Sequence, residues 1–474
     1  MILRWFGKKC GAGMPELELG TVARVISGQV FHGARNTVFK DFHFDSRAIA
    51  DHSLFFAFKT STGDGHRFVT QLAGRPGMGA VVLPDFDPNS VSFPIIRVAD
   101  TFQAARLLAA SVRDRFRSIH YVGIAGSAGK TTTKEFCFQI LSRHFTVFRS
   151  RENWNNAIGV PFSILKLTGQ EQVAVFELAM SDPGIGEIDL LAGLVKPDVA
   201  VVLNVFPVHL EYLKNLRNVA RAKAELLNHL AADDRAIVNG DSPLLVREVR
   251  KKTGCKILFG RTPGVNQVVL KEIRRQRERT AFTVDFFGIE ERFETTLVNH
   301  LQIENLVPAM LVAQELGMKN FQIQDALNGL TPIKGRGVIR RQRDCVIIDE
   351  TYNSNPEALK KTLAWVDSEY HQPKIAVLGD MLELGKQERD FHYQAGLFFA
   401  GLGFAWLITV GQRAEEIARG ARQGGFPGKR IRACGAVEGV GRLLQQLAQP
   451  GNVVLFKGSR GVALEKALEE FGDG

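Results

Sequence analysis

Short apolar runs alternate with longer amphipathic stretches from about residue 101 onward. The run "YVGIA" (121–125) is followed by "KTTTKEFCFQILSRHF" (130–145), whose apolar residues recur at helical spacing. Further apolar runs of strand length are "QVAVFEL" (172–178), "PDVAVVLNV" (197–205) and "RAIVNG" (235–240). Buried strands separated by amphipathic helices predict a parallel sheet that is covered by helices on both faces.

Two regions depart from this alternation, and it restarts near residue 335. Residues 1–100 mix short strand-like pieces with Gly, Asp and Pro turns. Residues 264–298 predict antiparallel strands on one edge of the central sheet. We therefore predict an α/β protein with a small mixed α/β N-terminal domain (1–100), a central parallel-sheet domain (101–333) and a C-terminal Rossmann-like α/β domain (334–474).

The composition is that of a folded globular protein. The chain has 474 residues, of which 45% are hydrophobic and 23% are charged. It contains no apolar run near the roughly 20 residues that span a bilayer, and its N-terminus lacks the apolar segment of a secretory signal. The five cysteines are scattered and never form a C-x-x-C pair, which favours reduced thiols in a cytoplasm. We expect a cytoplasmic protein without membrane insertion.

The net charge of +10 suggests acidic partners, which could be nucleic acid or small phosphorylated substrates. The densest basic stretch, "KEIRRQRERTAF" (271–282), alternates with apolar positions like a strand that has one solvated face. The other basic residues mostly do not cluster, so we expect no nucleic-acid partner.

The stretch "GIAGSAGKTTTKEF" (123–136) has the pattern G-x-x-G-K-T-T, which is shorter than the common phosphate-binding loop. An ordinary strand-to-helix turn is the alternative, but a buried strand, a glycine turn and a helix start are the context that a phosphate loop requires. Lys130 would contact the β- and γ-phosphates, and the Thr131 hydroxyl would bind Mg²⁺. The predicted nucleotide contacts of the loop are Gly126, Ser127, Ala128, Gly129, Lys130, Thr131 and Thr132.

This short loop resembles that of the Mur ligase family, which builds the cell-wall peptide. Folylpolyglutamate synthetases share the loop. The resemblance extends along nearly the whole chain. Its other motifs are "DSR" (45–47), "ENWNNAIGVPFSIL" (152–165), "FELAMSDPGIGEI" (176–188), "DETYNSNPEAL" (349–359), "VLGDMLELG" (377–385) and "LFKGSRG" (455–461).

The resemblance implies an ATP-dependent amide-bond-forming ligase that works through an acyl phosphate. The last three motifs are most similar to the branch that adds D-alanyl-D-alanine to UDP-N-acetylmuramoyl-tripeptide in bacterial peptidoglycan synthesis. It further implies ATP and Mg²⁺ as cofactors, these two substrates as the partners of the chain, and a bacterial cytoplasmic location. We expect a monomer. A sister ligase that adds diaminopimelate or lysine to the dipeptide precursor is the alternative.

Three residues resemble the family's metal-site residues. Glu177 ends a predicted strand, where a doubly wound sheet binds its ligands, and a carboxylate there suits Mg²⁺. His209 resembles the family histidine of a second metal site, although Mg²⁺ prefers oxygen ligands and a structural histidine is an equal alternative. Lys223 matches the lysine that these enzymes carry as a carbamate, an oxygen ligand. The resemblance thus implies Lys130, Glu177, His209 and Lys223 as catalytic residues, and Thr131, Glu177, His209 and carbamylated Lys223 as metal ligands.

The resemblance also implies nucleotide and substrate contacts in all three domains. Asn305 and Arg336 are the implied nucleotide contacts beyond the loop. Arg336 lies in "KGRG" (334–337), and the alternative is that this stretch is an ordinary linker between domains. For the segment after Asp349, the alternative to substrate binding is that its Asn and Pro residues cap the following helix. The implied substrate contacts are Asp45, Ser46, Arg47, Asn153, Asn156, Asp349, Tyr352, Asn353 and Asn355.

One segment departs from the family pattern. Family members usually carry G-x-H before the asparagine that matches Asn305, whereas this chain has "VNHLQIEN" (298–305). His300 stands one position early, which leaves the local register of the adenine-side contact open. A binding scaffold that descends from these enzymes would be expected to lose Lys130, Glu177 or Lys223, and all three are present.

Overall fold

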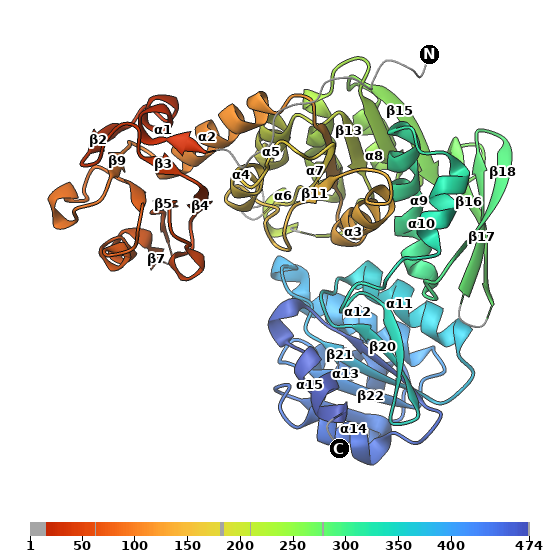
Figure 1. The fold of residues 1–474 in the computed structure, drawn as a ribbon. Helices are drawn as coiled ribbons and strands as arrows, with labels where there is room; N and C mark the ends of the chain where they lie inside the picture. The colour runs from red at the N-terminus through yellow and green to blue at the C-terminus, as the bar shows by residue number, and fades with distance from the viewer. Residues whose placement is uncertain (1–15, 62, 181–183, 209, 277–278, 473–474) are drawn as a thin grey trace.

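The computed structural model describes residues 16–61, 63–180, 184–208, 210–276 and 279–472. Three main sheets follow one another along the chain, and each lies in a separate part of the molecule (Figure 1). The C-terminal part lies beside the central part rather than beside the N-terminal one (Figure 1). This arrangement confirms the predicted three-part α/β fold. No described helix is long and apolar enough to cross a membrane.

The N-terminal sheet contains both parallel and antiparallel strand pairs. Its five strands have the order β2-β9-β8-β5-β4, in which β2 is antiparallel to β9 and the others are parallel. Helix α1 (Leu19–Val25) precedes the sheet, and two small pairs, β1–β3 and β6–β7, flank it. The strands of the main sheet are β2 (Gln29–Phe31), β4 (Asp41–His43), β5 (Ser53–Phe56), β8 (Gly79–Val82) and β9 (Ile95–Arg97). The pairs are formed by β1 (Leu17–Glu18) with β3 (Val38–Phe39) and by β6 (Lys59–Thr60) with β7 (Gly63–Asp64).

The central sheet has nine strands in the order β11-β12-β10-β13-β14-β15-β16-β17-β18. Strands β10 to β16 are parallel, whereas β17 and β18 continue the sheet antiparallel at one edge, as the pattern of residues 264–298 predicts. The strands are β10 (His120–Ala125), β11 (Val147–Arg149), β12 (Val173–Glu177), β13 (Val199–Val202), β14 (Arg235–Asn239), β15 (Cys255–Gly260), β16 (Val268–Gln276), β17 (Arg279–Phe286) and β18 (Ile289–Thr295).

Helices cover both faces of the central sheet. Successive residues of β10 enter different cores: Tyr121 packs in the core on one face and Val122 in the core on the other. One core takes side chains from α2, α4, α5 and α7, the other from α3, α9 and α10. Helix α3 ends at Leu141, four residues before the predicted end, and the chain turns there. The helices are α2 (Thr101–Arg115), α3 (Lys130–Leu141), α4 (Gly159–Ile164), α5 (Glu187–Val195), α6 (Leu210–Leu213), α7 (Leu216–Ala224), α8 (Pro243–Val249), α9 (His300–Glu315) and α10 (Asn320–Leu327).

The C-terminal sheet has six strands in the order β19-β20-β24-β21-β22-β23. Only β19 is antiparallel to its neighbour, so the predicted Rossmann-like alternation is confirmed. The strands are β19 (Val338–Gln342), β20 (Cys345–Glu350), β21 (Lys374–Gly379), β22 (Trp406–Val410), β23 (Ile431–Cys434) and β24 (Val453–Lys457). The helices are α11 (Pro356–Glu369), α12 (Glu388–Ala400), α13 (Glu415–Gln423), α14 (Val440–Leu447) and α15 (Glu465–Gly472).

An aromatic cluster joins the N-terminal and central parts. Phe162 in α4 is fully buried, and its ring centroid lies 4.9 Å from that of Phe44 and 5.4 Å from that of Phe56. Phe58 stacks on Phe102 of α2 at 4.3 Å. Aromatic pairs at these distances add to the free energy gained by burying the rings, so this cluster fixes the N-terminal part to the central part.

Replacing Phe162 with alanine is expected to lower the free energy of unfolding by about 3–5 kcal/mol, because it leaves a cavity between three aromatic rings. Urea unfolding, monitored by fluorescence, measures the change. Phe321 is 74% exposed, so its replacement by alanine is the matched control and should change stability by less than about 0.5 kcal/mol. A loss below about 1 kcal/mol for Phe162→Ala would contradict the structural role of the cluster.

Candidate active site

The predicted phosphate loop lies between β10 and α3. Gly129, immediately before the helix, has a φ angle of 80°, which lies in the left-handed region that favours glycine. A Cβ atom at this position would lie 2.0 Å from Asn305 Oδ1. The left-handed backbone therefore favours glycine, and a larger residue would have to displace the Asn305 side chain. The same contact brings Asn305, from α9, against the loop.

Asn204 supports the loop from the end of β13. Its Oδ1 accepts a hydrogen bond from the Ala128 N–H at 2.8 Å, and its Nδ2 donates to the Ala128 carbonyl at 3.0 Å. The Ser127 N–H donates to the Asn204 carbonyl at 3.1 Å. Sequence reasoning missed Asn204. Its place directly after a buried parallel strand, at the edge where such sheets bind ligands, is the signal that could have found it.

Lys130 is folded back over the loop. Its Nζ donates to the Gly126 carbonyl at 2.9 Å. Burial lowers the pKa of Lys130, with the charge of Arg336 acting in the same direction, whereas the carboxylates of Glu177 and Glu383 act to raise it. Lys130 therefore lies among charged groups that come from both the central and the C-terminal parts.

Glu177 is a buried carboxylate at the end of β12. Its Oε2 accepts from the Thr131 hydroxyl at 2.6 Å and its Oε1 from Asn155 Nδ2 at 2.9 Å. Burial acts to raise its pKa, but the charge of Lys130 and the bond from Thr131 hold the pKa below its ordinary value. Glu177 is thus ionised and oriented on both oxygens. Sequence reasoning missed Asn155.

Lys223 is buried in the last turn of α7, with 1% of its surface exposed. Burial and the charge of Lys130 lower the pKa of Lys223 to about 7. Two residues later, the Glu225 carboxylate accepts from the N–H groups of Gly186 and Asp189 at 2.8 and 3.2 Å, at the start of α5. This segment is therefore held firmly against α5.

The predicted metal ligands are brought together in part. Thr131 and Glu177 are in direct contact, and Lys130 interacts electrostatically with both Glu177 and Lys223. His209 lies outside the described residues. In the part of the chain that the structure describes, no group of three His, Cys, Asp or Glu residues could hold a metal ion. Among the described candidates, Glu177 and the Thr131 hydroxyl are the two that are in direct contact.

A polar chain links the C-terminal part to the central part. The Tyr352 hydroxyl donates to Asn153 Oδ1 at 2.9 Å, and Asn153 has a φ angle of 64°, which asparagine tolerates better than most residues. The Arg336 guanidinium lies over the Tyr352 ring at 3.8 Å. Asn153 of the central part is therefore brought together with two residues of the C-terminal part.

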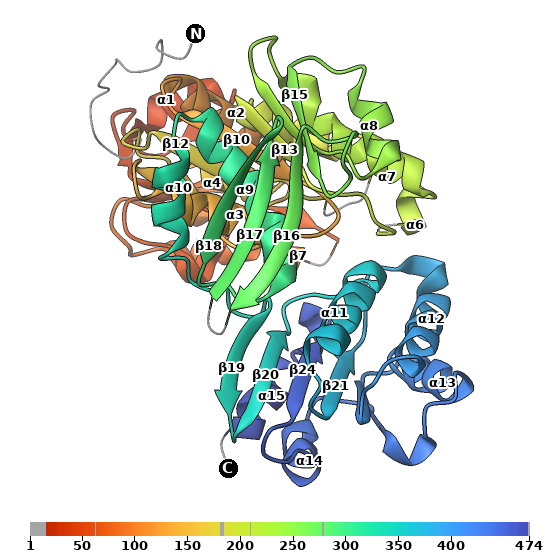
Figure 2. The ribbon, with the colours of Figure 1, turned by 90° about the vertical axis from the view of Figure 1, so that its right-hand side faces the viewer.

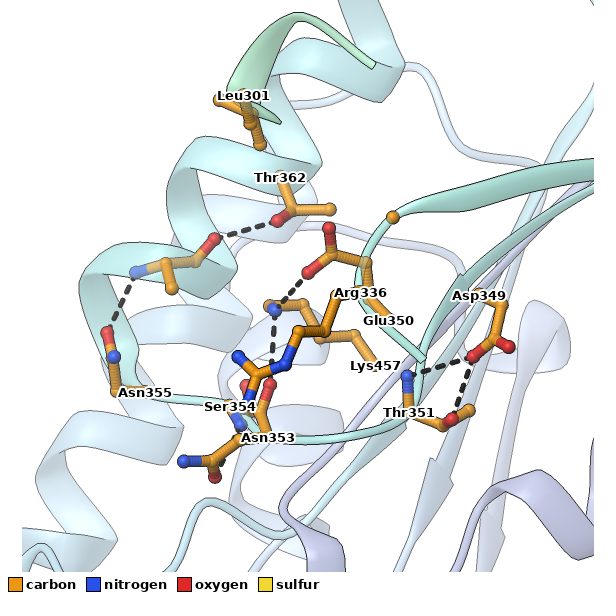
Figure 3. Close-up of polar contacts among 12 residues, drawn as sticks. Leu301, Arg336, Asp349, Glu350, Thr351, Asn353, Ser354, Asn355, Thr362 and Lys457 are labelled. Atoms are coloured by element: carbon orange, nitrogen blue, oxygen red, sulfur yellow. Dashed lines mark hydrogen bonds and ion pairs between the residues drawn. The ribbon is translucent and has the colours of Figure 1, made fainter. Parts of the chain in front are cut away.

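Other predicted substrate residues have local contacts. Asp349 accepts from the Thr351 hydroxyl at 2.7 Å (Figure 3). Asn355 caps α11 by accepting from the Ala358 N–H at 2.9 Å, and Asn353 accepts from the Ser354 N–H at 2.8 Å. Asn156 accepts from the N–H groups of residues 158 and 159, at the start of α4. Asn355 thus makes the helix-capping contact that the alternative interpretation predicts.

The predicted N-terminal substrate residues form one short turn. Asp45 caps the 3₁₀ turn Ser46–Ala48, and its carboxylate pairs with Arg47 at 2.7 Å. The Arg47 side chain is 88% exposed. This turn presents a charged pair to solvent on the N-terminal part of the molecule.

The departure around His300 has a structural explanation. Asn299 caps α9 by accepting from the Leu301 N–H at 2.9 Å. His300 lies 3.9 Å from the Glu369 carboxylate of α11. Despite the altered motif, Asn305 lies against the phosphate loop, and the Thr133 hydroxyl donates to its carbonyl at 3.3 Å.

The sequence is similar to a family of ligases over most of its length. Residues 124–313 match the Mur ligase middle domain, and residues 335–460 match the glutamate ligase domain of Mur ligases. The UDP-N-acetylmuramoyl-tripeptide--D-alanyl-D-alanine ligase of Bacillus subtilis is 31% identical over 470 residues, which cover 98% of each chain. The ligase of the same name from Escherichia coli is 28% identical and covers 90% of this chain and 93% of its own.

Solved structures show the same relationship. MurF from Acinetobacter baumannii is 26% identical, covers 98% of this chain and 100% of its own, and superposes with a TM-score of 0.86. MurF from Thermotoga maritima in complex with ADP is 28% identical, covers 91% and 97%, and has a TM-score of 0.80. With a full-length relative at 31% identity and matches to both the middle and the C-terminal domain, the chain belongs to the Mur ligase family.

Proposed function

We propose that this chain uses ATP to join D-alanyl-D-alanine to UDP-N-acetylmuramoyl-tripeptide, which gives the pentapeptide precursor of peptidoglycan. The names of the full-length relatives support these substrates. The observation that carries the reaction type is the arrangement around the phosphate loop. There Lys130 and the buried carboxylate of Glu177 lie together, and Arg336 of the C-terminal part acts on the same lysine.

The residues of this site suit the chemistry of acyl-phosphate formation. The tripeptide carboxylate must attack the γ-phosphate of ATP, so the site has to neutralise negative charge and align the two groups. Lys130 supplies a cation at the loop, and Arg336 supplies a second from the facing part. The N–H groups at the start of α3 are oriented toward the same loop.

The residues also fit Mg²⁺, a metal ion that commonly accompanies ATP at phosphoryl-transfer sites. Glu177 is ionised, buried and in contact with the Thr131 hydroxyl, and hard oxygen ligands of this type are those that Mg²⁺ prefers. When bound, Mg²⁺ would neutralise phosphate charge. Thr131 and Glu177 would hold it, and we place His209 in the same ligand set.

We further infer that Lys223 carries a carbamate. Carbamylation by CO₂ requires the neutral amine, and a pKa near 7 leaves about half of the amine neutral at pH 7. An ordinary lysine with a pKa near 10.4 would be almost wholly charged there. The carbamate would replace a buried cation by an anion beside Lys130, which favours the modified form.

The remaining predicted contacts are part of the same proposal. Asn305 and Arg336 would contact the nucleotide, and the turn at residues 45–47 would contact the uridine nucleotide. Asn153, Asn156 and the segment at residues 349–355 would line the path of the peptide substrates. We place the domain boundaries near residues 100 and 334, and the reaction in the bacterial cytoplasm.

Phosphate release from ATP tests the proposed function. It is expected only when UDP-N-acetylmuramoyl-tripeptide and D-alanyl-D-alanine are both present, and the tripeptide should be tried with either diaminopimelate or lysine as its third residue. Release that instead requires the dipeptide precursor and a free amino acid would assign the chain to the sister ligases. Mass spectrometry of the product distinguishes the two outcomes.

A further inference from the structure

The loop that follows β21 places an acidic residue in an unusual conformation. Glu383 has a φ angle of 65°, which glutamate rarely adopts because of the clash of its Cβ with the backbone. The loop lies at the carboxyl end of β21, between the ends of β24 and β22. Parallel sheets bind ligands at this edge, and strained residues at such places often serve function.

The base of this loop is rigid. The Asp380 carbonyl accepts from the Ser459 N–H at 3.0 Å. The Met381 N–H donates to His392 Nε2 at 2.9 Å, and the Leu382 N–H donates to the Ser459 hydroxyl at 3.0 Å. Three consecutive residues are therefore anchored to two other segments. Glu383 extends from this fixed base, so its conformation is imposed by the fold.

The loop faces the central part of the molecule. The turn that follows it, η6 (Gly385–Gln387), contacts α6, and the start of α12 lies near α6 in Figure 2. The Glu383 carboxylate acts to raise the pKa of Lys130 in the phosphate loop. An acid from the C-terminal part is therefore close enough to interact with the site where the acyl phosphate would form.

We propose that Glu383 binds the ammonium group of the incoming dipeptide and accepts a proton from it. This inference rests on the proposed function, because that reaction needs a free amine beside the acyl phosphate. The dipeptide arrives with a positively charged amino end, which a carboxylate attracts. Placing that carboxylate on the C-terminal part would bring the amine to the phosphate loop from the C-terminal part of the molecule.

The proton balance of the step is complete. The ammonium gives one proton to the Glu383 carboxylate, which later releases it to water. The freed nitrogen lone pair forms the C–N bond, and the C–O bond to phosphate breaks. The departing phosphate takes the electrons of that bond together with the second proton of the nitrogen. Both protons lost by the amine are thereby accounted for.

Two other carboxylates at this edge have contacts that suit a supporting role. Glu350 accepts from the Lys457 ammonium at 2.7 Å, and Lys457 also donates to the Asn353 carbonyl at 3.4 Å (Figure 3). Asp349 is turned toward Thr351 (Figure 3). These bonds fix the loops around the ends of β20 and β24. We assign the amine to Glu383, because the turn that follows it contacts α6 of the central part.

The variant Glu383→Gln tests the proposal, because glutamine has nearly the same shape but no charge. We expect kcat/KM for D-alanyl-D-alanine to fall about 100-fold, with a rise in KM for the dipeptide. Acyl-phosphate formation should change less than about threefold. It is measured without dipeptide, as the scrambling of oxygen isotopes in ATP that depends on the tripeptide.

The controls separate the possible outcomes. Glu438 lies in the same part of the molecule and is 71% exposed, and its ion pair with Lys466 is long, at 4.0 Å. Glu438→Gln should therefore leave kcat and the KM values within about twofold of those of the unmodified protein. A dipeptide kcat/KM of Glu383→Gln within about threefold of the unmodified protein would overturn the proposal. So would a lower KM for ATP with an unchanged KM for dipeptide, because Glu383 would then compete with phosphate for Lys130. Absence of isotope scrambling in the unmodified protein would instead contradict the proposed function.

Discussion

The variant Lys130→Ala is expected to lower kcat for phosphate release by about 1,000-fold or more, since it removes the cation that we propose contacts the transferred phosphoryl group. The loop itself should survive, because Gly129 is held by its own conformation and the Asn204 bonds to Ala128 do not involve the lysine side chain. Steady-state phosphate release measures the effect.

The fold of this variant has to be checked separately. Removing Lys130 takes one cation away from the buried Glu177, but the charge of Lys134 also acts on that carboxylate. We therefore expect an unchanged far-UV circular dichroism spectrum. Lys466→Ala is the matched control, because this lysine is 66% exposed and weakly paired. Activity of Lys130→Ala near that of the control would show that the short loop is not the phosphate site.

The order of strands and helices could be predicted from the sequence because burial leaves a local record. The apolar runs before each amphipathic stretch correspond to β10, β12, β13 and β14, and the alternating runs of residues 264–298 correspond to β16, β17 and β18. The order of the strands within each sheet could not be predicted in this way. Strand β24 lies between β20 and β21, although it follows them by more than 70 residues. Its position depends on long-range packing, which no local pattern encodes.

In the candidate site, too, some residues could be predicted from the sequence and others could not. The loop residues were predictable because their spacing is itself the chemical requirement. The asparagines of "NWNN" were not distinguishable, since three similar side chains stand within four positions. In the structure, Asn155 contacts Glu177, Asn153 contacts Tyr352, and Asn156 caps a helix turn. Which asparagine faces which partner depends on elements that only the fold brings together.

The variant Lys223→Ala is expected to lose most activity and to regain part of it when short-chain carboxylates such as acetate or formate are added. Lys223 is almost fully buried, so its removal leaves a space beside Lys130 that a small carboxylate can enter. The added anion would supply the oxygen that we propose the carbamate provides in the unmodified protein. Phosphate release, measured with increasing carboxylate concentration, gives the degree of rescue.

The variant Lys223→Arg separates this explanation from a simple packing defect. Arginine keeps the positive charge, fills the space and cannot be carbamylated, so carboxylates should not restore its activity. The pKa of about 7 also fixes a pH dependence in the unmodified protein. Below pH 7 the amine is increasingly protonated and unable to react with CO₂, so activity should fall toward acid and rise with added bicarbonate near neutrality. Full activity of both variants without any additive would show that Lys223 has no part in the metal site, which would then have to be built around Glu177.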